Sequence, residues 1–230
     1  MRSFPLTNRP LRRLAALLLI VLATGCITIE EHYTFKKNGS GTMEYVMDMS
    51  ALAGLMDAFD QGSGKSKEKK NDGPMGTGFD ERAEQLKHVQ GIKRVKQKNE
   101  EDGFIQRVSF AFQDLDALNR ALNVLMPDST GTQQTFFRWE GNTLVRTNNN
   151  YAKQLGGEMG DGADSTELSG MLESMKYKYS FKFAKQVADV QLAEGVTKES
   201  PSPKKLELAT DWSVIMKDPN ALDLRITLDN

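Results

Sequence analysis

The chain has 230 residues, with 30 basic and 31 acidic side chains, two histidines and one cysteine. This length suits one domain, and a 39% share of apolar residues is enough for a hydrophobic core. A single cysteine excludes an internal disulfide and any cysteine-based zinc cluster. The formal net charge of −1 argues against nucleic acid as a partner, because nucleic-acid-binding domains are commonly basic.

The first 25 residues have the pattern of a secretory signal peptide. They carry four arginines and no acid, and an uncharged apolar run extends from Leu14 to Ala23. A basic start followed by roughly 7–15 apolar residues is typical of a signal peptide, whereas a membrane-spanning helix needs ~20 apolar residues. We therefore predict that residues 1–25 are removed. The remaining residues, 26–230, carry five more acidic than basic side chains.

The apolar run ends in Leu22-Ala23-Thr24-Gly25-Cys26, which resembles the lipobox of bacterial lipoproteins. Ala23 stands where that family more often has leucine. The resemblance implies cleavage between Gly25 and Cys26 and attachment of lipid, including palmitate, to the Cys26 thiol. The alternatives are a plain signal peptide with an unrelated cysteine, or a buried free thiol.

Lipidation at Cys26 would make the membrane a partner of this protein through an N-terminal lipid anchor. Two or three acyl chains hold a protein stably, at ~0.8 kcal/mol per buried CH₂. Ile27 is not the aspartate that, in the sorting rule of Gram-negative lipoproteins, retains them at the inner membrane. The resemblance therefore implies the cell envelope as the location and favours the outer membrane.

The chain after Cys26 begins with a hairpin followed by a helix. Polar and apolar residues alternate over 27–35 and again over 43–49, which is the period of a half-buried strand. Residues 37–41 between them form a turn cluster of Asn, Gly and Ser. Ser50 is a suitable N-cap, and apolar residues then recur at helical spacing as far as Phe59.

The middle of the chain repeats the hairpin-then-helix pattern. A flexible Gly-, Ser- and Lys-rich loop is expected at 61–78 and a short helix at 80–88. The runs 92–98 and 104–112 flank an Asn-, Asp- and Gly-containing turn and form a second hairpin. Asp114 then caps a helix with a leucine stripe that ends before Pro127.

The last third is expected to be mainly β. A hairpin is expected over 134–147 around Gly141-Asn142, then a flexible Gly-rich loop near 155–165 and a short helix over 166–174. Strands are predicted at residues 177–183, 187–192, 206–209 and 222–228. We therefore predict an α+β fold for a single domain over 26–230, with mostly antiparallel β-hairpins and two or three helices packed on one face.

The sequence has no recognisable catalytic or metal-binding motif, and we expect no cofactor. His32 lies on the polar side of a strand and His88 at the end of a charged helix, and neither accompanies a G-x-S-x-G or H-E-x-x-H string. We therefore expect a non-enzymatic protein. The alternative is an envelope hydrolase whose carboxylates converge in the fold, since two acids are enough for glycoside chemistry.

The strand over 177–183 is the clearest candidate for a binding surface. Tyr177, Tyr179, Phe181 and Phe183 alternate with polar residues and so share one face. This face is either the core side of the sheet, covered by the leucine-rich helices, or the wall of a groove. In the second case Tyr177 and Tyr179 would line a site for an apolar or amphiphilic ligand.

A further resemblance rests on the early strand, the Asn38–Gly41 turn and the late strand pair 177–192 that leads to 206–212. Together with the lipobox, these features are similar to the LppM-type domain of bacterial lipoproteins. The resemblance implies an α+β domain in contact with envelope lipid or glycolipid, and it assigns no binding residues. We accordingly predict a membrane-anchored envelope lipoprotein with a binding or assembly role, whose partner is a lipid or an envelope protein.

Overall fold

The structure is a computed structural model that describes residues 27–51, 78–127, 131–147, 170, 172–218 and 220–230. The predicted signal peptide, the Gly25–Cys26 cleavage site and almost all of both Gly-rich loops lie outside these ranges. Most of the helix expected after Ser50 also lies outside them. No helix within the described ranges has the length and apolar character to cross a membrane.

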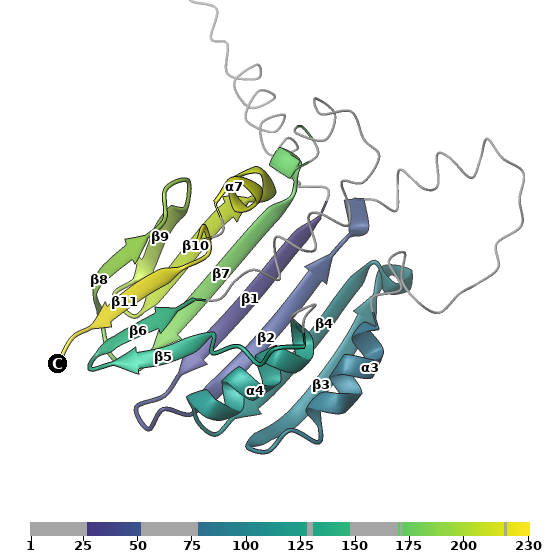
Figure 1. Cartoon of the computed structure of the whole chain (residues 1–230), viewed down its shortest axis with the longest axis horizontal. Helices are drawn as coiled ribbons and strands as arrows, with labels where there is room; N and C mark the ends of the chain where they lie inside the picture. Colours follow the sequence, from purple (N-terminus) through teal and green to yellow (C-terminus); the bar gives the residue numbers. More distant parts are fainter. Residues whose placement is uncertain (1–26, 52–77, 128–130, 148–169, 171, 219) are drawn as a thin grey trace, which may run out of the picture.

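Seven strands form the larger of two sheets, in the order β3-β4-β2-β1-β7-β10-β9 (Figure 1). Every pair is antiparallel except β1 with β7, which run parallel. The strands are β1 (Thr28–Phe35), β2 (Gly41–Asp48), β3 (Ile92–Glu100), β4 (Ile105–Phe112), β7 (Lys176–Phe183), β9 (Thr197–Ser202) and β10 (Lys205–Asp211).

Four short strands form a smaller antiparallel sheet, in the order β5-β6-β11-β8. They are β5 (Phe137–Glu140), β6 (Thr143–Arg146), β8 (Val187–Leu192) and β11 (Leu224–Leu228). The strands predicted over 177–192 therefore do not pair with each other, because β7 belongs to the large sheet and β8 to the small one. Only three residues separate β7 from β8, so the chain passes between the two sheets within one tight connection.

The described helices are few: α3 (Phe79–Leu86), α4 (Leu115–Leu125), α7 (Trp212–Lys217) and the single 3₁₀ turn η1 (Glu101–Gly103). The predicted cap of α4 is present, since the Asp114 side chain accepts a hydrogen bond of 2.8 Å from the Ala117 N–H. Figure 1 shows α3, α4 and the small sheet side by side in front of the large sheet. The α+β class is thus confirmed, with sheets that are large and helices that are few.

Burial alternates along the strands of the large sheet and divides it into two faces. The core face carries apolar side chains such as Ile29, Met43, Val108, Phe181 and Leu208, which pack against α3, α4 and the small sheet. On β1 and β7 the residues between them are polar and half-buried or exposed. We call this second side of the large sheet the open face.

Two elements were not predicted from the sequence. Strand β9 has the sequence TKESPS and every one of its residues is exposed, so it lacks the apolar alternation by which strands are recognised. Helix α7 is capped by Asp211, which accepts hydrogen bonds from the N–H groups of Ser213 and Val214, but with six residues it is too short for a helical apolar period.

Candidate functional site

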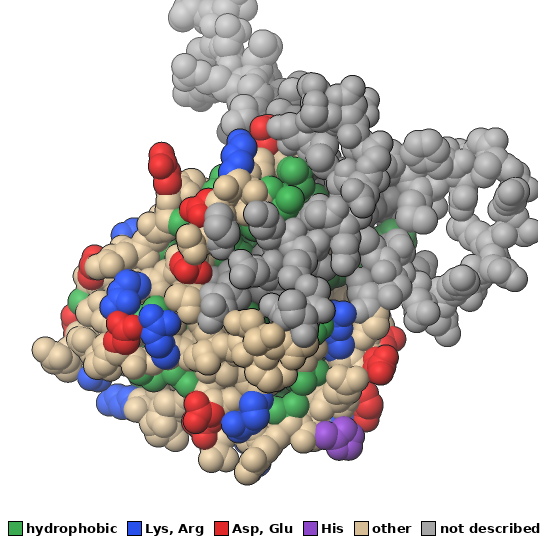
Figure 2. Space-filling model, in the orientation of Figure 1, with side chains coloured by type: hydrophobic (Ala, Val, Ile, Leu, Met, Phe, Trp, Pro, Cys, Tyr) green, Lys and Arg blue, Asp and Glu red, His purple; other side chains and the backbone are tan. Residues whose placement is uncertain are grey.

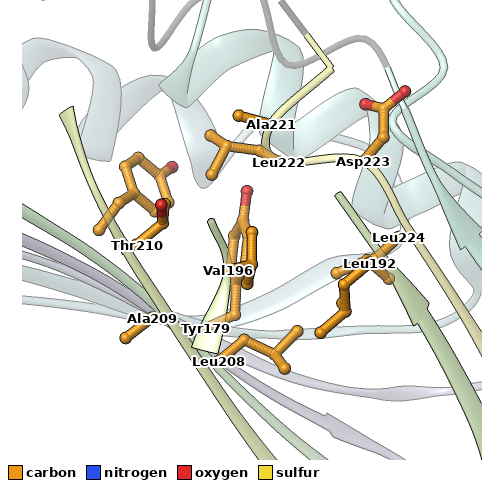
Figure 3. A pocket seen from close by; sticks show the side chains of 11 residues that line it. Tyr179, Leu192, Val196, Leu208, Ala209, Thr210, Ala221, Leu222, Asp223 and Leu224 are labelled. Atoms are coloured by element: carbon orange, nitrogen blue, oxygen red, sulfur yellow. The ribbon is translucent and has the colours of Figure 1, made fainter. Parts of the chain in front are cut away.

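Tyr177 and Tyr179, the residues predicted to line a groove, lie in the core between the two sheets. Their exposed fractions are 1% and 4%. Figure 3 shows Tyr179 standing between Leu208 on one side and Leu222 and Leu224 on the other. The space beside these rings measures about 10 Å³, which corresponds to about one water molecule. The structure therefore favours the core alternative over the groove for this pair.

A buried charged cluster joins the two sheets next to these tyrosines. Arg146 of β6 and Glu31 of β1 are both 0% exposed, and their side chains form two contacts of 2.5 and 3.1 Å. The hydroxyls of Tyr33 and Tyr177 both donate hydrogen bonds to the Glu31 carboxylate. The Arg146 guanidinium also lies 4.4 Å from the ring centroid of Tyr179, within the range of a cation–π interaction.

The electrostatics of this cluster keep the ion pair charged. Burial on its own would raise the pKa of Glu31, but the attraction and hydrogen bonds of Arg146, with those of both tyrosines, hold this pKa below its usual value. Burial raises the pKa of Tyr33 well above its usual value, so its hydroxyl stays a donor. Because the cluster is inaccessible, its arrangement serves to connect the sheets and does not provide a site for substrate.

An accessible cleft opens at one end of the space between the same two sheets. It has a volume of about 260 Å³ and lies where β1 and β7 of the large sheet end beside the β5–β6 turn of the small sheet. Its apolar lining comes from Phe35, Trp139, Phe183 and Leu228. Trp139, at 36%, is the one large hydrophobic side chain among the described residues that is exposed. We call this site the end cleft.

The parallel pairing of β1 and β7 builds the floor of the end cleft. Parallel strands finish at the same edge of a sheet, so Phe35 and Phe183 are register partners and their rings stack with centroids 5.5 Å apart. Trp139 belongs to the small sheet, and its ring meets the Phe35 ring edge to face, with the two centroids 6.2 Å apart. The Asn142 side-chain amide donates to the Leu228 carbonyl at 2.5 Å, which fixes the β5–β6 turn to the end of β11.

The polar rim of the end cleft is positively charged. Lys36 and Lys37 follow β1, Lys185 follows β7, and all three are exposed. None of the three forms an ion pair within the described part of the chain, and no Asp or Glu is among the residues that line the cleft. An apolar floor with an uncompensated cationic rim is chemically suited to a molecule with an apolar part and an anionic head group.

The charged residues of the rest of the surface are more evenly mixed. Figure 2 shows basic and acidic side chains dispersed over the side of the molecule that carries the helices and the small sheet. On the open face, Glu30 accepts hydrogen bonds of 3.0 Å from His32 and 3.1 Å from Lys178, and these bonds lower its pKa to about 2. Within the described ranges, no group of three or more His, Cys, Asp or Glu side chains could hold a metal ion.

The residues of the end cleft were not identified from the sequence. Phe35 and Phe183 were recognised as strand residues, but their adjacency depends on the parallel pairing of strands separated by more than a hundred residues. The available signal was local: Lys36-Lys37 and Lys185 each follow the last aromatic residue of a strand. The predicted lipidation residue, Cys26, lies outside the described residues, so Gly25 and Cys26 remain predictions.

Comparisons with known proteins identify no family for this chain. Its sequence matches no protein-family model and no curated protein. Among solved structures, the chain is similar to the folded domain of LppM from Mycobacterium tuberculosis, determined by NMR, with a TM-score of 0.42 and 11% sequence identity. The alignment covers 89% of this chain and 90% of that domain.

Proposed function

We propose that this protein is a non-enzymatic binding protein of the cell envelope, anchored through lipid on Cys26, whose end cleft takes an anionic amphiphile. The observation that carries the proposal is an aromatic floor, exposed at Trp139 and continued by the buried rings of Phe35 and Phe183, beside three lysines that lack acidic partners in the described chain. The end cleft would then bury the apolar chain of the amphiphile against the aromatic rings, and the lysines would attract its anionic head group at the same site.

The size of the end cleft limits what it can hold. Its volume of about 260 Å³ lies near the lower end of the ~300–1,000 Å³ found for ligand pockets. We expect one acyl or alkyl chain end to lie against the aromatic rings, at ~0.8 kcal/mol per buried CH₂. The head group would remain at the rim, where lysine ammonium groups attract phosphate or carboxylate oxygens.

The position of the end cleft determines from which side a ligand would approach. Strand β1 begins at Thr28, two residues after Cys26, and ends at Phe35 in the cleft. At ~3.3 Å per residue, these two ends of β1 are about 23 Å apart. In this proposal the cleft faces away from the membrane that holds the anchor, and it receives its ligand from the aqueous compartment or from a facing surface.

Calorimetric titration of the full chain in phosphatidylcholine nanodiscs tests the cleft. Octyl phosphate should bind, whereas octyl glucoside, which lacks the charge, and inorganic phosphate, which lacks the chain, should bind about tenfold or more weakly. The double variant Lys36→Gln/Lys185→Gln should weaken octyl phosphate binding about tenfold. Lys217→Gln, which removes an exposed lysine of α7 distant from the cleft, is the matched control. Equal binding of octyl phosphate and octyl glucoside would contradict the proposal.

The anchor has its own test. Cys26→Ser should abolish incorporation of labelled palmitate and release the protein from the membrane fraction, and density separation of the two membranes tests the preference for the outer one. Labelling that persists in Cys26→Ser would contradict lipidation at this residue. The hydrolase alternative remains a prediction, which a screen of the purified chain against envelope glycans and esters would test.

A further inference from the structure

We propose that a hollow on the open face of the large sheet, beside Arg94, is a second binding site, and that it takes a saccharide bearing a phosphate or carboxylate group. The hollow has a volume of about 370 Å³ and is lined by β1, β2, β3 and β4. It faces away from the space between the sheets, so it is separate from the end cleft. Residues that line it include Arg94, Lys96, Glu44, His32, Thr42 and Ser109.

The backbone at Arg94 is the first observation. Arg94 has a φ of 57°, in the left-handed region that costs non-glycine residues roughly 1–2 kcal/mol. It lies in a β-bulge, because the register of β3 against β4 shifts between Lys93 and Lys96. Glycine is the residue that fits such a bulge without strain. The chain has arginine there instead, and Arg94 is among the residues that line the hollow.

The cations of the hollow are available to a ligand. Arg94 and Lys96 are both exposed. Neither side chain forms a hydrogen bond or an ion pair with another described residue. By contrast, the neighbouring Lys98 and Arg107 both contact Glu100. Two adjacent cations without partners, one of them a planar guanidinium, suit the oxygens of a phosphate or carboxylate.

The register of the sheet shows what lies beside these cations. Lys96 pairs with Ser109, Ser109 with Glu44 and Glu44 with His32, so four side chains form one row across β3, β4, β2 and β1. Neighbouring strands are ~4.8 Å apart, which places Glu44 about 10 Å from Lys96 along the row. An anion without a sugar, such as inorganic phosphate, would contact only the cations Arg94 and Lys96 at one end of the hollow. The carboxylate, hydroxyl and imidazole groups further along are suited to sugar hydroxyls.

Thr42 and Thr34 extend the hydroxyl-bearing part of the hollow. They form the next row of register partners on β2 and β1, and both line the same space. An anionic group held by Arg94 and Lys96 would therefore place an attached sugar ring over threonine and serine hydroxyls and over Glu44. The site thus combines charge recognition at one end with neutral hydrogen bonding at the other.

Titration calorimetry of the full chain in phosphatidylcholine nanodiscs tests this site with glucose 6-phosphate, glucuronate, glucose and inorganic phosphate. At least one of the two anionic sugars should bind about tenfold or more tightly than glucose and than inorganic phosphate. Whichever of glucose 6-phosphate and glucuronate binds more tightly identifies the anionic group. Binding of neither, or equal binding of inorganic phosphate, would overturn the proposal.

Two variants separate the role of the Arg94 side chain from that of its backbone. Arg94→Gly should lose binding about tenfold or more while its melting temperature stays within about 4 °C of wild type, because relief of strain offsets the larger chain entropy of glycine. Glu101→Gly relaxes the other described non-glycine residue with positive φ, 49°, and should bind like wild type. If Arg94→Gly fails to fold, Lys96→Gln must show the loss. Unchanged binding in Arg94→Gly or in Lys96→Gln would overturn the proposal.

Discussion

The centre and the end of the space between the two sheets are built in opposite ways. At the centre, Arg146 of the small sheet reaches Glu31 of the large one, and both are 0% exposed. At the end, three lysines stand at the rim without acidic partners among the described residues, and Trp139 is 36% exposed. Cations are present in both places, but only the buried one is neutralised.

This difference separates a structural role from a binding role. A buried charge that loses its partner is strongly destabilising, so the central cluster must be complete in the folded protein. Exposed lysines require no acidic partner for folding, so they are available to bind the anionic group of a ligand. We therefore expect substitutions at the centre to change stability and substitutions at the end to change binding.

The largest effect is expected at the central pair. Glu31→Gln leaves the Arg146 guanidinium buried without its carboxylate and should lower the free energy of unfolding by about 3–5 kcal/mol. The double variant Glu31→Gln/Arg146→Met removes the unpaired charge and should lose less than the sum of the two single variants. Urea unfolding measures both. A loss below about 1 kcal/mol in Glu31→Gln would contradict the structural role of the pair.

Removing one donor from the cluster should have a smaller effect. Tyr177→Phe deletes a hydrogen bond to the Glu31 carboxylate and should cost about 1.5–3 kcal/mol of unfolding free energy, the range for hydrogen bonds to charged groups. Tyr45→Phe is the control, because Tyr45 is also buried in the core but is not a hydrogen-bond donor to Glu31. Equal losses of unfolding free energy in Tyr177→Phe and Tyr45→Phe would contradict a stabilising contribution of the hydrogen bond to Glu31.

At the end cleft, the predicted effect on binding is larger than the effect on stability. Trp139→Ala should weaken binding of octyl phosphate about tenfold, since the ring supplies part of the apolar wall. Its free energy of unfolding should fall by about 1–3 kcal/mol, less than in Glu31→Gln, because the ring is partly exposed but also packs against Phe35. Intact binding of octyl phosphate together with a loss of unfolding free energy as large as that in Glu31→Gln would show that Trp139 belongs to the core and not to a binding site.

The smallest effect is expected at Glu30, which immediately precedes Glu31 in β1 but lies on the open face. Its pKa is lowered to about 2 from the usual 4.5, chiefly by the hydrogen bond from His32. Its contribution to stability is therefore complete above about pH 4.5 and is lost as the pH falls towards 2. Because Glu30 is half-exposed, solvent screening limits this contribution to less than about 1 kcal/mol.

The comparison of wild type with Glu30→Gln measures this contribution. Between pH 4.5 and 2 the unfolding free energy of Glu30→Gln should fall less steeply than that of wild type. Glu44 lies on the same face but accepts no hydrogen bond from His32 in the described structure, so Glu44→Gln serves as the control. Identical slopes in wild type and Glu30→Gln would show that the contact with His32 does not persist in solution.

Local features of this fold were predictable from the sequence, and long-range ones were not. The cap at Asp114 and the turn at Gly141-Asn142 depend on neighbouring residues, and both are present. The parallel pairing of β1 with β7 depends on contacts between segments far apart in the chain, and the hairpin pattern pointed to antiparallel partners. The end cleft exists because of this parallel pairing, which is why its residues were missed.

The same reasoning explains the outcome for charged residues. Glu31 lies in a strand of alternating character, and its position on the core face follows from that alternation. Its partner Arg146 is 115 residues away in the chain, and no local pattern distinguishes it from an exposed arginine. Buried ion pairs of this kind become visible only once the two sheets are placed together.

The central claim, that the end cleft holds the apolar chain of an amphiphile, is tested most directly by quenching of Trp139. The chain has two tryptophans, and the other, Trp212, is fully buried beside Tyr177 near the opposite end of the large sheet. Octyl phosphate brominated on its terminal carbon should quench wild-type emission and leave Trp139→Phe unaffected. Equal quenching of the two proteins, or none at saturating ligand, would contradict the account.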